Sequence, residues 1–490
     1  MKYASSEQTK QFLTSHQLTP KRLGRTDLYV AEAGFGTYRI DEVNQDHRSS
    51  LKHAIGKGIN VIDTSANYTD GKSESCVGHI LHELYDEGVV QRDQVVVMTK
   101  AGYIQGETYK ENHDYPDIVT YQTGLHHCIH PDFLAAELEK SLDRLQIPCI
   151  DVFLLHNPEY YKLKAQQDGT DLTVANKEYY DRIKKAFEFL ETAVEEGLIR
   201  HYGISSNTFG VAESVYSKTC IQTTLAIAES LSPHHHFSVV QFPLNLLETA
   251  PAVVPVPDTN QTTCQFAAAH DLGVFINRPL NALSGQQMCR LVELEIEEDV
   301  SVIEVDDMLL EFSLTEEQLK QTVQEFLDSV DSSETVPDFD CAALLKQIWM
   351  SQPDVFSWKN VLDTFLVPRI EHQCGLINFP DDHEKLFVAM DTYLHGMKET
   401  SRFMNSYFVQ RHNHKIYQLT DYLANKLPDW NTTFSITNKA LRALRQTPGV
   451  TSVLVGMRRK SYVDTIVSDL TTPVSPLPDE HWAIMSEFTF

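Results

Sequence analysis

Long apolar runs are missing from the sequence, although 42% of its 490 residues are hydrophobic. No stretch of about 18 apolar residues occurs, which excludes a membrane-spanning helix from the expected structure. The polar segment 1–24 also lacks the apolar core of a signal peptide, so we expect a cytoplasmic protein. The hydrophobic fraction is still large enough to form an extensive buried core.

Paired cysteines and excess basic residues are missing as well. The eight cysteines are scattered and form no CxxC pair, which argues against a zinc ribbon or a disulfide framework and favours reduced thiols. A net charge of −27 argues against nucleic acid or an anionic membrane as a partner. The charge is uneven, because 17 acidic residues and a single basic residue, Lys320, lie between Glu293 and Asp340.

Short apolar runs alternate with amphipathic stretches along most of the chain. This alternation predicts parallel strands buried on both faces, and eight such units predict a (β/α)₈ TIM barrel of the α/β class. The alternative is an open doubly wound sheet, which favours a G-x-G-x-x-G loop after its first strand, where this chain has "GFGTYR". The expected strands are 29–36, 59–63, 94–100, 150–156, 199–205, 237–242, 273–277 and 450–456, and the clearest helices are 131–146, 181–197, 265–273 and 435–449.

A long segment separates the seventh expected strand from the helix before the eighth. Such a length requires structure of its own, so we predict a large, mainly helical insertion in this loop, with an acidic first third that is partly disordered. The acidic stretch 293–340 is a candidate surface for a protein partner. The expected domains are an N-terminal extension 1–20, a barrel of 21–284 with 431–490, and an insertion 285–430 with helices at 314–330, 341–350, 357–366, 383–397 and 416–427.

Polar residues end several of the expected strands. Asp63, Lys100, His156 and Gln241 end the second, third, fourth and sixth strands, and Tyr68 follows the second. Because the C-terminal ends of barrel strands meet at one rim, these side chains are expected to lie together.

This combination of groups suits proton transfer to an oxygen atom. A phenol has a pKa of about 10, and a neighbouring ammonium lowers it. We therefore expect Lys100, paired with Asp63, to lower the pKa of Tyr68, while His156 orients a carbonyl group. None of these groups is an obvious nucleophile, and a hydride from a bound nicotinamide would serve. An alternative is a barrel lyase in which Lys100 forms a Schiff base.

Several motifs carry a resemblance to the aldo-keto reductase family. The chain resembles that family over 20–284 and 431–490, through "GRTDLYVAEAGFGTYRI", "IDTSANYTDGKSESCVGHIL", "VVMTKAG", "DVFLLHNPE", "LIRHYGISSNTF", "VVQFPLNLLE" and "TPGVTSVLVGMRRKSYVDTIV". The resemblance implies an NAD(P)(H)-dependent oxidoreductase that acts on an aldehyde, a ketone or a sugar carbonyl. It assigns Tyr68 as general acid and base, Lys100 and Asp63 as its activating pair, and His156 as the residue that positions the carbonyl.

The resemblance also implies a set of cofactor-binding residues, and this chain departs from the family pattern in two segments. Asn277 and Arg278 replace a Tyr-Ser pair whose tyrosine stacks on the nicotinamide in many members. In the last segment, Tyr462 stands where an arginine is common and Thr465-Ile466 replaces Glu-Asn. The position of Ser206 is usually asparagine, and Asn207 follows it. A cationic stretch near Arg458 favours NADP(H) over NAD(H). The implied cofactor residues are Gly36, Thr37, Tyr38, Asp63, Ser205, Ser206, Gln241, Asn277, Arg278, Pro279, Leu280, Gly456 and Arg458.

Two histidine-rich segments, 126–130 and 233–237, raise the question of a zinc site. Adjacent histidines do not converge easily on one metal and no cysteine or carboxylate is suitably spaced, so we expect loop residues and no metal. A second function of a different class stays open: a cofactor-binding regulatory or scaffold protein with little turnover. The family's channel β-subunits make such a role conceivable, and the acidic insertion motivates it.

Overall fold

The computed structural model describes residues 2–110, 114–284, 287–330, 335–377, 383–430 and 434–490. The chain divides into two compact units. The first comprises Met1–Leu291 and Thr432–Thr489, and the second comprises Val292–Asn431 with Phe490. The hairpin of β13 (Asn281–Ser284) and β14 (Gln287–Arg290) therefore belongs to the first unit, whereas the expected insertion started at residue 285.

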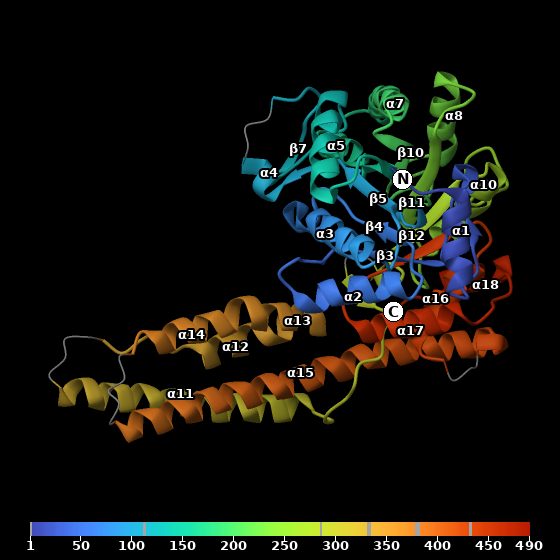
Figure 1. Ribbon diagram of the computed structural model, residues 1–490. Coiled ribbons are helices and arrows are strands. Elements are labelled where there is room, and N and C mark those ends of the chain that lie inside the picture. The colour runs from blue at the N-terminus through green and yellow to red at the C-terminus, as the bar shows by residue number, and fades with distance from the viewer. Residues whose placement is uncertain (1, 111–113, 285–286, 331–334, 378–382, 431–433) are drawn as a thin grey trace. The chain divides into compact units, whose positions relative to one another are not determined.

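The first unit is a closed barrel of eight parallel strands, as the alternation of apolar runs and helices predicted (Figure 1). Most of the strands are short and consist of buried residues, and every residue of the fourth, from Ile150 to His156, is buried. This is the pattern of a sheet covered by helices on its outer face. In chain order the strands are β3 (Ala33–Gly36), β4 (Val61–Asp63), β5 (Val96–Ala101), β9 (Ile150–His156), β10 (Ile199–Ser205), β11 (Phe237–Pro243), β12 (Gly273–Asn277) and β15 (Ser452–Val455).

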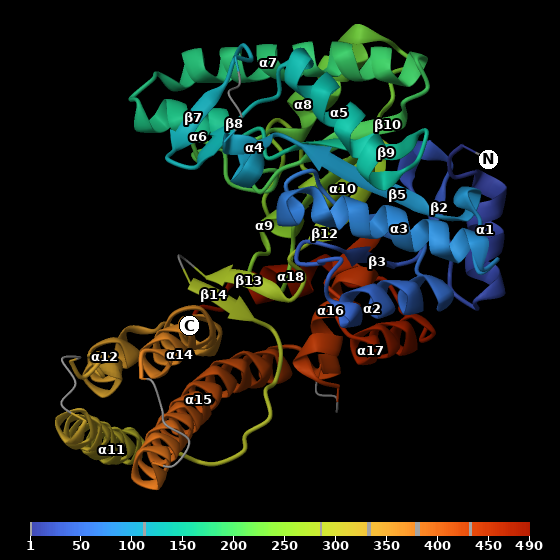
Figure 2. The same ribbon diagram turned by 60° about the vertical axis from the view of Figure 1, so that its left-hand side comes forward.

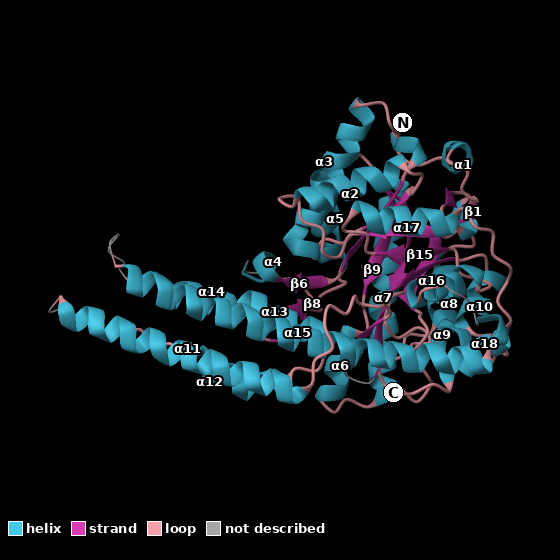
Figure 3. Cartoon of the chain, turned by 90° about the horizontal axis from the view of Figure 1, so that it is seen from below, coloured by secondary structure: helices cyan, strands magenta, loops and turns pink. Residues whose placement is uncertain are grey.

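Helices cover the outside of the barrel, as Figures 2 and 3 show. The helix before β9 illustrates why they form: His130 caps its N-terminus, Pro131 occupies the first turn, and Leu134 and Leu138 face the strands. The barrel helices are α2 (Gln45–Gly56), α3 (Lys72–Asp86), α5 (Pro131–Leu145), α7 (Leu172–Glu195), α8 (Ile221–Leu231), α10 (Thr263–Ala269), α16 (Ile436–Gln446) and α17 (Lys460–Leu470).

Strand register brings the polar strand ends together. Ser205 at the end of β10 lies opposite both His156 of β9 and Gln241 of β11. Close packing between β10 and β11 depends on Gly203, since a Cβ atom there would lie 1.8 Å from the carbonyl oxygen of Val239. A larger residue at position 203 would therefore shift the register that aligns these side chains.

Besides the β13–β14 hairpin, the described residues form two smaller sheets next to the barrel. β1 (Lys21–Arg22) pairs with β2 (Tyr29–Val30), so the single strand expected at 29–36 is in fact split into β2 and β3. The loop after β5 carries the antiparallel sheet of β6 (Tyr103–Gln105), β8 (Leu125–His127) and β7 (Val119–Gln122). His126 and His127 thus lie in a strand and not in a loop.

The N-terminal segment is tied to the barrel through a buried carboxylate. Asp151 accepts hydrogen bonds from the backbone N–H groups of Ala4, at 2.7 Å, and Val97, at 2.8 Å. Its other partner is the guanidinium of Arg92, 2.8 Å away and also buried. The helix α1 (Ser6–Ser15) follows this attachment point.

We expect Asp151→Ala to lower the free energy of unfolding by about 3–5 kcal/mol, because it leaves Arg92 buried without its ionic partner. Denaturation in urea measures the change. Arg22→Ala is the matched control, since Arg22 pairs with Asp271 at the exposed surface and such pairs contribute little. An equally small loss in both variants would contradict the prediction.

The second unit is helical. Its two longest helices, α11 (Val302–Ser329) and α15 (Glu384–Lys426), lie side by side, with the ring of Phe312 stacked on that of Tyr393 (Figure 1). Val305 and Leu309 are buried on the same face of α11. The remaining helical segments among the described residues of this unit are α12 (Cys341–Ile348), η4 (Trp349–Ser351), α13 (Val355–Val361), the adjoining turn η5 (Leu362–Leu366), α14 (Val367–Gly375) and η6 (Pro428–Trp430).

Two expectations for this unit are wrong. The acidic residues 302–329 form a continuous helix, because apolar residues at helical spacing bury one face of it. The separate helices expected at 383–397 and 416–427 are parts of α15. Within the residues that the structure describes, no helix is both long and apolar enough to cross a membrane.

Candidate active site

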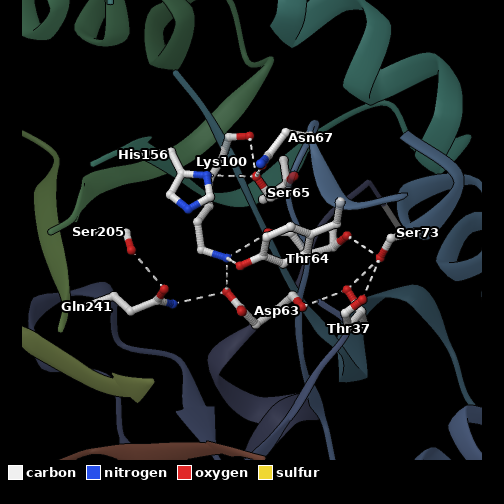
Figure 4. A network of polar contacts seen from close by, with 12 residues as sticks. Thr37, Asp63, Thr64, Ser65, Asn67, Ser73, Lys100, His156, Ser205 and Gln241 are labelled. Atoms are coloured by element: carbon white, nitrogen blue, oxygen red, sulfur yellow. Dashed lines mark hydrogen bonds and ion pairs between the residues drawn. The ribbon is translucent and has the colours of Figure 1, made fainter. Parts of the chain in front are cut away.

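Three of the four catalytic candidates form a continuous chain of polar contacts. The ammonium of Lys100 lies 2.7 Å from Asp63 Oδ1 and donates to the hydroxyl of Tyr68 at 3.2 Å (Figure 4). It donates again to the carbonyl oxygen of Thr64 at 2.8 Å. All three donor positions of the ammonium are therefore used, which fixes its place between the carboxylate and the phenol.

Local structure holds Asp63 and Tyr68 in this arrangement. The backbone N–H and the hydroxyl of Thr37 both donate to the carbonyl oxygen of Asp63, at 3.0 and 2.9 Å. Tyr68 begins the tight turn η2 (Tyr68–Gly71), in which Thr69, Asp70 and Gly71 have positive φ angles. Such backbone is strained for residues other than glycine.

Burial decides the acidity of Tyr68. Burial raises the pKa of Tyr68 and Lys100 lowers it, and the net result is a pKa above the ordinary value of 10. The ammonium of Lys100 thus lowers the pKa of Tyr68 as expected, but burial raises that pKa by more. Tyr68 keeps its proton at neutral pH and is a hydrogen-bond donor there.

Lys100 stays charged despite its complete burial. Burial lowers the pKa of Lys100, but the neighbouring Asp63 and Tyr68 raise it by more, so that the pKa lies above its ordinary value of 10.5. A Schiff base requires a neutral amine as nucleophile. The geometry thus disfavours the lyase alternative.

His156 lies beside Tyr68, with the two rings edge to face and their centroids 5.9 Å apart. Nδ1 of His156 is 3.0 Å from the hydroxyl of Ser65. Burial, together with the charges of Lys100 and His127, holds the pKa of His156 well below 6.5. His156 is therefore a neutral imidazole at physiological pH.

Gln241 connects the catalytic candidates to the neighbouring strand. Its amide nitrogen donates to Asp63 Oδ1 at 3.0 Å, and its amide oxygen accepts from the hydroxyl of Ser205 at 2.9 Å. Ser206 points elsewhere, since its hydroxyl bonds to Thr219 and Thr208. The structure therefore brings Ser205 and Gln241 to the site and keeps the Ser206 hydroxyl away from it.

Unpaired polar atoms lie at the end of β12. Asn277 Oδ1 and Arg278 Nε are buried without a hydrogen-bond partner among the described residues, although another nitrogen of Arg278 donates to Glu248 at 2.6 Å. Buried polar atoms normally have partners, so these two atoms fit a polar ligand at this place. Pro279 and Leu280 continue this loop.

Positive charge collects at the start of α17. Arg458, Arg459 and Lys460 follow Gly456, and among the described residues none of the three has an ionic partner. A helix N-terminus with free cations suits a phosphate group. Within the described chain no cluster of histidine, cysteine or acidic residues could hold a metal ion.

Some residues of the site carried no recognisable sequence signal. Ser65 and Asn67 are ordinary polar residues until the fold places them beside His156. Glu159 is buried next to the loop after β10, where Oε1 accepts the N–H of Asn207 at 2.8 Å. Burial raises the pKa of Glu159 to about 7.

The sequence itself matches a known family. Residues 32–283 match the model described as the aldo/keto reductase family, which is half of the chain. The chain belongs to the aldo-keto reductase family. The barrel fold is consistent with this family, and the match to the family model confirms the resemblance that the motifs indicated.

Curated relatives of this aldo-keto reductase match only in part. The "Uncharacterized oxidoreductase YqkF" of Bacillus subtilis is 27% identical over 201 residues, which cover 41% of this chain and 53% of that protein. The "NADH-specific methylglyoxal reductase" of Escherichia coli is 32% identical over 142 residues, or 27% of this chain and 40% of that protein. The chain thus spans about half the length of the curated relatives it matches.

Solved structures of aldo-keto reductases are also similar to this chain. AKR11C1 from Bacillus halodurans, in its holo form, has 16% identity and a TM-score of 0.46, with 96% of each chain covered. An aldo-keto reductase from Klebsiella pneumoniae in complex with NADPH has 21% identity and a TM-score of 0.35, covering 54% of this chain and 68% of that one.

Proposed function

We propose that this aldo-keto reductase is an NAD(P)(H)-dependent oxidoreductase that reversibly reduces an aldehyde, a ketone or a sugar carbonyl. The chain of contacts from Asp63 through Lys100 to Tyr68 carries the proposal, since it aims a protonated phenol at the mouth of the barrel. When bound, a reduced nicotinamide would supply the hydride for the carbonyl carbon. Tyr68 supplies the proton that the carbonyl oxygen receives, and takes it back in the reverse direction.

The neighbouring residues prepare Tyr68 for this transfer. Lys100 stabilises the phenolate that forms when Tyr68 gives up its proton, because a cation lies 3.2 Å from the charged oxygen. Asp63 keeps Lys100 charged and in position. His156 contacts the substrate on the other side of Tyr68 and sets its orientation.

The cofactor in this proposal is NADP(H) in preference to NAD(H). Ser205 and Gln241 would hold the carboxamide of the nicotinamide, and Asn277 and Arg278 offer unpaired polar atoms beside it. Arg458 would pair with the 2′-phosphate. The further residues in the proposed cofactor set are Gly36, Thr37, Tyr38, Asp63, Pro279, Leu280 and Gly456, and Ser206 is left out because its hydroxyl bonds to Thr219 and Thr208.

We expect Arg458→Ala to raise the KM for NADPH about 10- to 100-fold, the size of one lost charged hydrogen bond, with little change for NADH. Steady-state kinetics with each cofactor measures the change. Lys52→Ala is the matched control, because Lys52 is a cation on the neighbouring helix α2 that already pairs with Glu83 and Glu87. An equal loss with both cofactors would contradict the assignment.

The proposed activity is tested by cofactor oxidation with a panel of aldehydes, ketones and sugars, using NADPH and then NADH. Turnover with any of these carbonyl compounds supports the proposal. Tight NADPH binding without turnover across the panel would overturn it. The regulatory alternative, with a partner bound through 293–340, would then become the leading hypothesis.

The expected pH dependence of kcat follows from the shifted pKa values of Tyr68 and His156. The pKa of Tyr68 is raised above 10, so it is protonated below that pH, and the pKa of His156 is lowered well below 6.5, so it is neutral above that pH. We expect kcat for carbonyl reduction to be nearly constant between about pH 6.5 and 9.5. A fall in kcat with a midpoint near pH 8 would show that Lys100 outweighs burial at Tyr68.

A further inference from the structure

The backbone at the end of β10 is held at three successive residues. The carbonyl oxygen of Ser205 accepts the N–H of Asn157 at 2.7 Å, and the N–H of Ser206 donates to the neighbouring strand β11 at 2.9 Å. These two bonds continue the hydrogen-bond pattern of the parallel sheet. The next N–H, that of Asn207, donates to the side chain of Glu159 at 2.8 Å. A carboxylate thus holds the turn where it leaves the sheet.

Glu159 is a deeply buried acid. It lies three residues after His156, directly before the helix α6 (Tyr160–Gln167), and is 2% exposed. Its Oε2 has no hydrogen-bond partner among the described residues. A buried carboxylate loses its hydration and depends on hydrogen-bond donors to stay ionised. The contact with Asn207 therefore stabilises the ionised form of Glu159.

Glu159 changes its protonation state near neutral pH. Burial raises the pKa of its carboxyl to about 7, although neighbouring N–H groups and the charge of Arg278 lower it. An ionised carboxylate forms a stronger hydrogen bond with an N–H group than a neutral carboxyl does. The contact with Asn207 is therefore strong above about pH 7 and weaker below it.

Other titratable and charged groups act on Glu159 from the elements around it. Tyr103 lies on β6, Tyr160 on α6 and Tyr179 on α7, and burial raises the pKa of each phenol above its ordinary value of 10.0. Arg278 follows β12 and contributes a positive charge. The three phenols keep their protons between about pH 6 and 8.5, so a change of the turn in this range is assigned to Glu159.

The turn held by Glu159 borders the place proposed for the cofactor. Ser205 donates its hydroxyl to Gln241 at 2.9 Å, and both residues are proposed to hold the carboxamide of the nicotinamide. A loosely held turn lets Ser205 leave this geometry. Cofactor binding must then restore it, which lowers the apparent affinity.

We propose that Glu159 is a positioning residue for cofactor binding, whose ionised carboxylate holds the turn 205–207 in the shape that receives the carboxamide. This inference rests on the proposed function. Glu159 acts through the backbone of Asn207 and contacts neither cofactor nor substrate. By linkage, cofactor binding favours the ionised form of Glu159, and a proton taken up by Glu159 weakens binding to the same extent.

The first test measures the Kd for NADPH by fluorescence titration between about pH 6 and 8.5. In the wild-type protein we expect the Kd to rise by up to about tenfold as the pH falls through 7, with kcat at saturating NADPH unchanged. Glu159→Gln should lack this rise, because its amide oxygen accepts the same hydrogen bond but does not titrate. The 2′-phosphate titrates near pH 6 with both proteins, so the ratio of their Kd values isolates Glu159.

Glu191 provides the matched control. Its carboxylate accepts the backbone N–H of His236 at 2.7 Å, outside the proposed site. Burial raises the pKa of Glu191, but hydrogen bonds with His236 and Tyr202 lower it by more, so Glu191 stays ionised over this pH range. Glu191→Gln should keep the wild-type pH dependence of the Kd. An equal pH dependence in the wild type and Glu159→Gln, or its loss in Glu191→Gln as well, would overturn the proposal.

The second test follows the hydrogen bond itself and needs no cofactor. Protein labelled with ¹⁵N-asparagine reports the backbone N–H of Asn207 by NMR, assigned by its loss in Asn207→Ser. We expect its chemical shift to move with a midpoint near pH 7 in the wild type and to stay constant in Glu159→Gln. A wild-type signal that does not move between about pH 6 and 8.5 would overturn the hold by Glu159 even if the enzyme is active.

The two tests also separate this inference from the function on which it rests. A wild-type protein that does not bind NADPH would remove the proposed function and the cofactor part of the inference together, while the Asn207 signal would still decide whether Glu159 holds the turn. An active enzyme with the same pH dependence of the Kd in the wild type and Glu159→Gln would leave the proposed function intact and overturn this inference alone.

Discussion

Tyr68→Phe is expected to lower kcat for carbonyl reduction by about 10²- to 10⁴-fold, the range found for the loss of a general acid. The variant removes the hydroxyl to which Lys100 donates, and the charged pair of Lys100 with Asp63 remains. Binding of NADPH should therefore change little. The measurements are single-turnover kinetics for the chemical step and fluorescence titration for the cofactor.

A second tyrosine provides the control for this variant. Tyr216 donates its hydroxyl to the carbonyl oxygen of Thr170 at 2.7 Å, outside the proposed site. Tyr216→Phe should keep full activity. If Tyr68→Phe retained more than about a tenth of the wild-type kcat, the proton would have to come from another donor and the proposed role of Tyr68 would be wrong.

The barrel could be read from the sequence because its strands are unambiguous. The run from Ile150 to His156 is apolar almost throughout, a pattern that is typical of a strand buried on both faces of a parallel sheet. The bounds expected for this strand are those of β9. The long helix α15 was harder to predict from the sequence. Its middle, near 398–415, is rich in polar residues, so the two more apolar flanks looked like separate helices.

In the active site, too, the sequence predicts some features and not others. Asp63 and His156 end their strands and Lys100 is one residue from the end of β5, and a strand end in a barrel has a known place on the rim. The pKa of Tyr68 could not be read in the same way, because the sequence shows that a lysine is near but not how deeply the phenol is buried. The contacts of Ser65 were also hidden, since its partners come from β5, β9 and the adjoining turn.

Lys100→Met should weaken both catalysis and folding. The variant removes the cation that stabilises the Tyr68 phenolate, and we expect kcat to fall by about 10²- to 10³-fold, as for the loss of one electrostatic donor. Among the described residues, it also leaves the buried carboxylate of Asp63 with Gln241 as its remaining side-chain partner. An unpaired buried charge of this kind costs about 3–5 kcal/mol in the free energy of unfolding.

The double variant Lys100→Met/Asp63→Asn separates these two effects. Replacing the carboxylate by an amide removes the unpaired charge, so the free energy of unfolding should recover most of its loss. The kcat should not recover, because Tyr68 still lacks its ammonium partner. Urea denaturation and steady-state kinetics on the four proteins of this cycle give both quantities. Recovery of activity together with stability would mean that Lys100 only holds the fold, and the ammonium would then have no part in moving the proton of Tyr68.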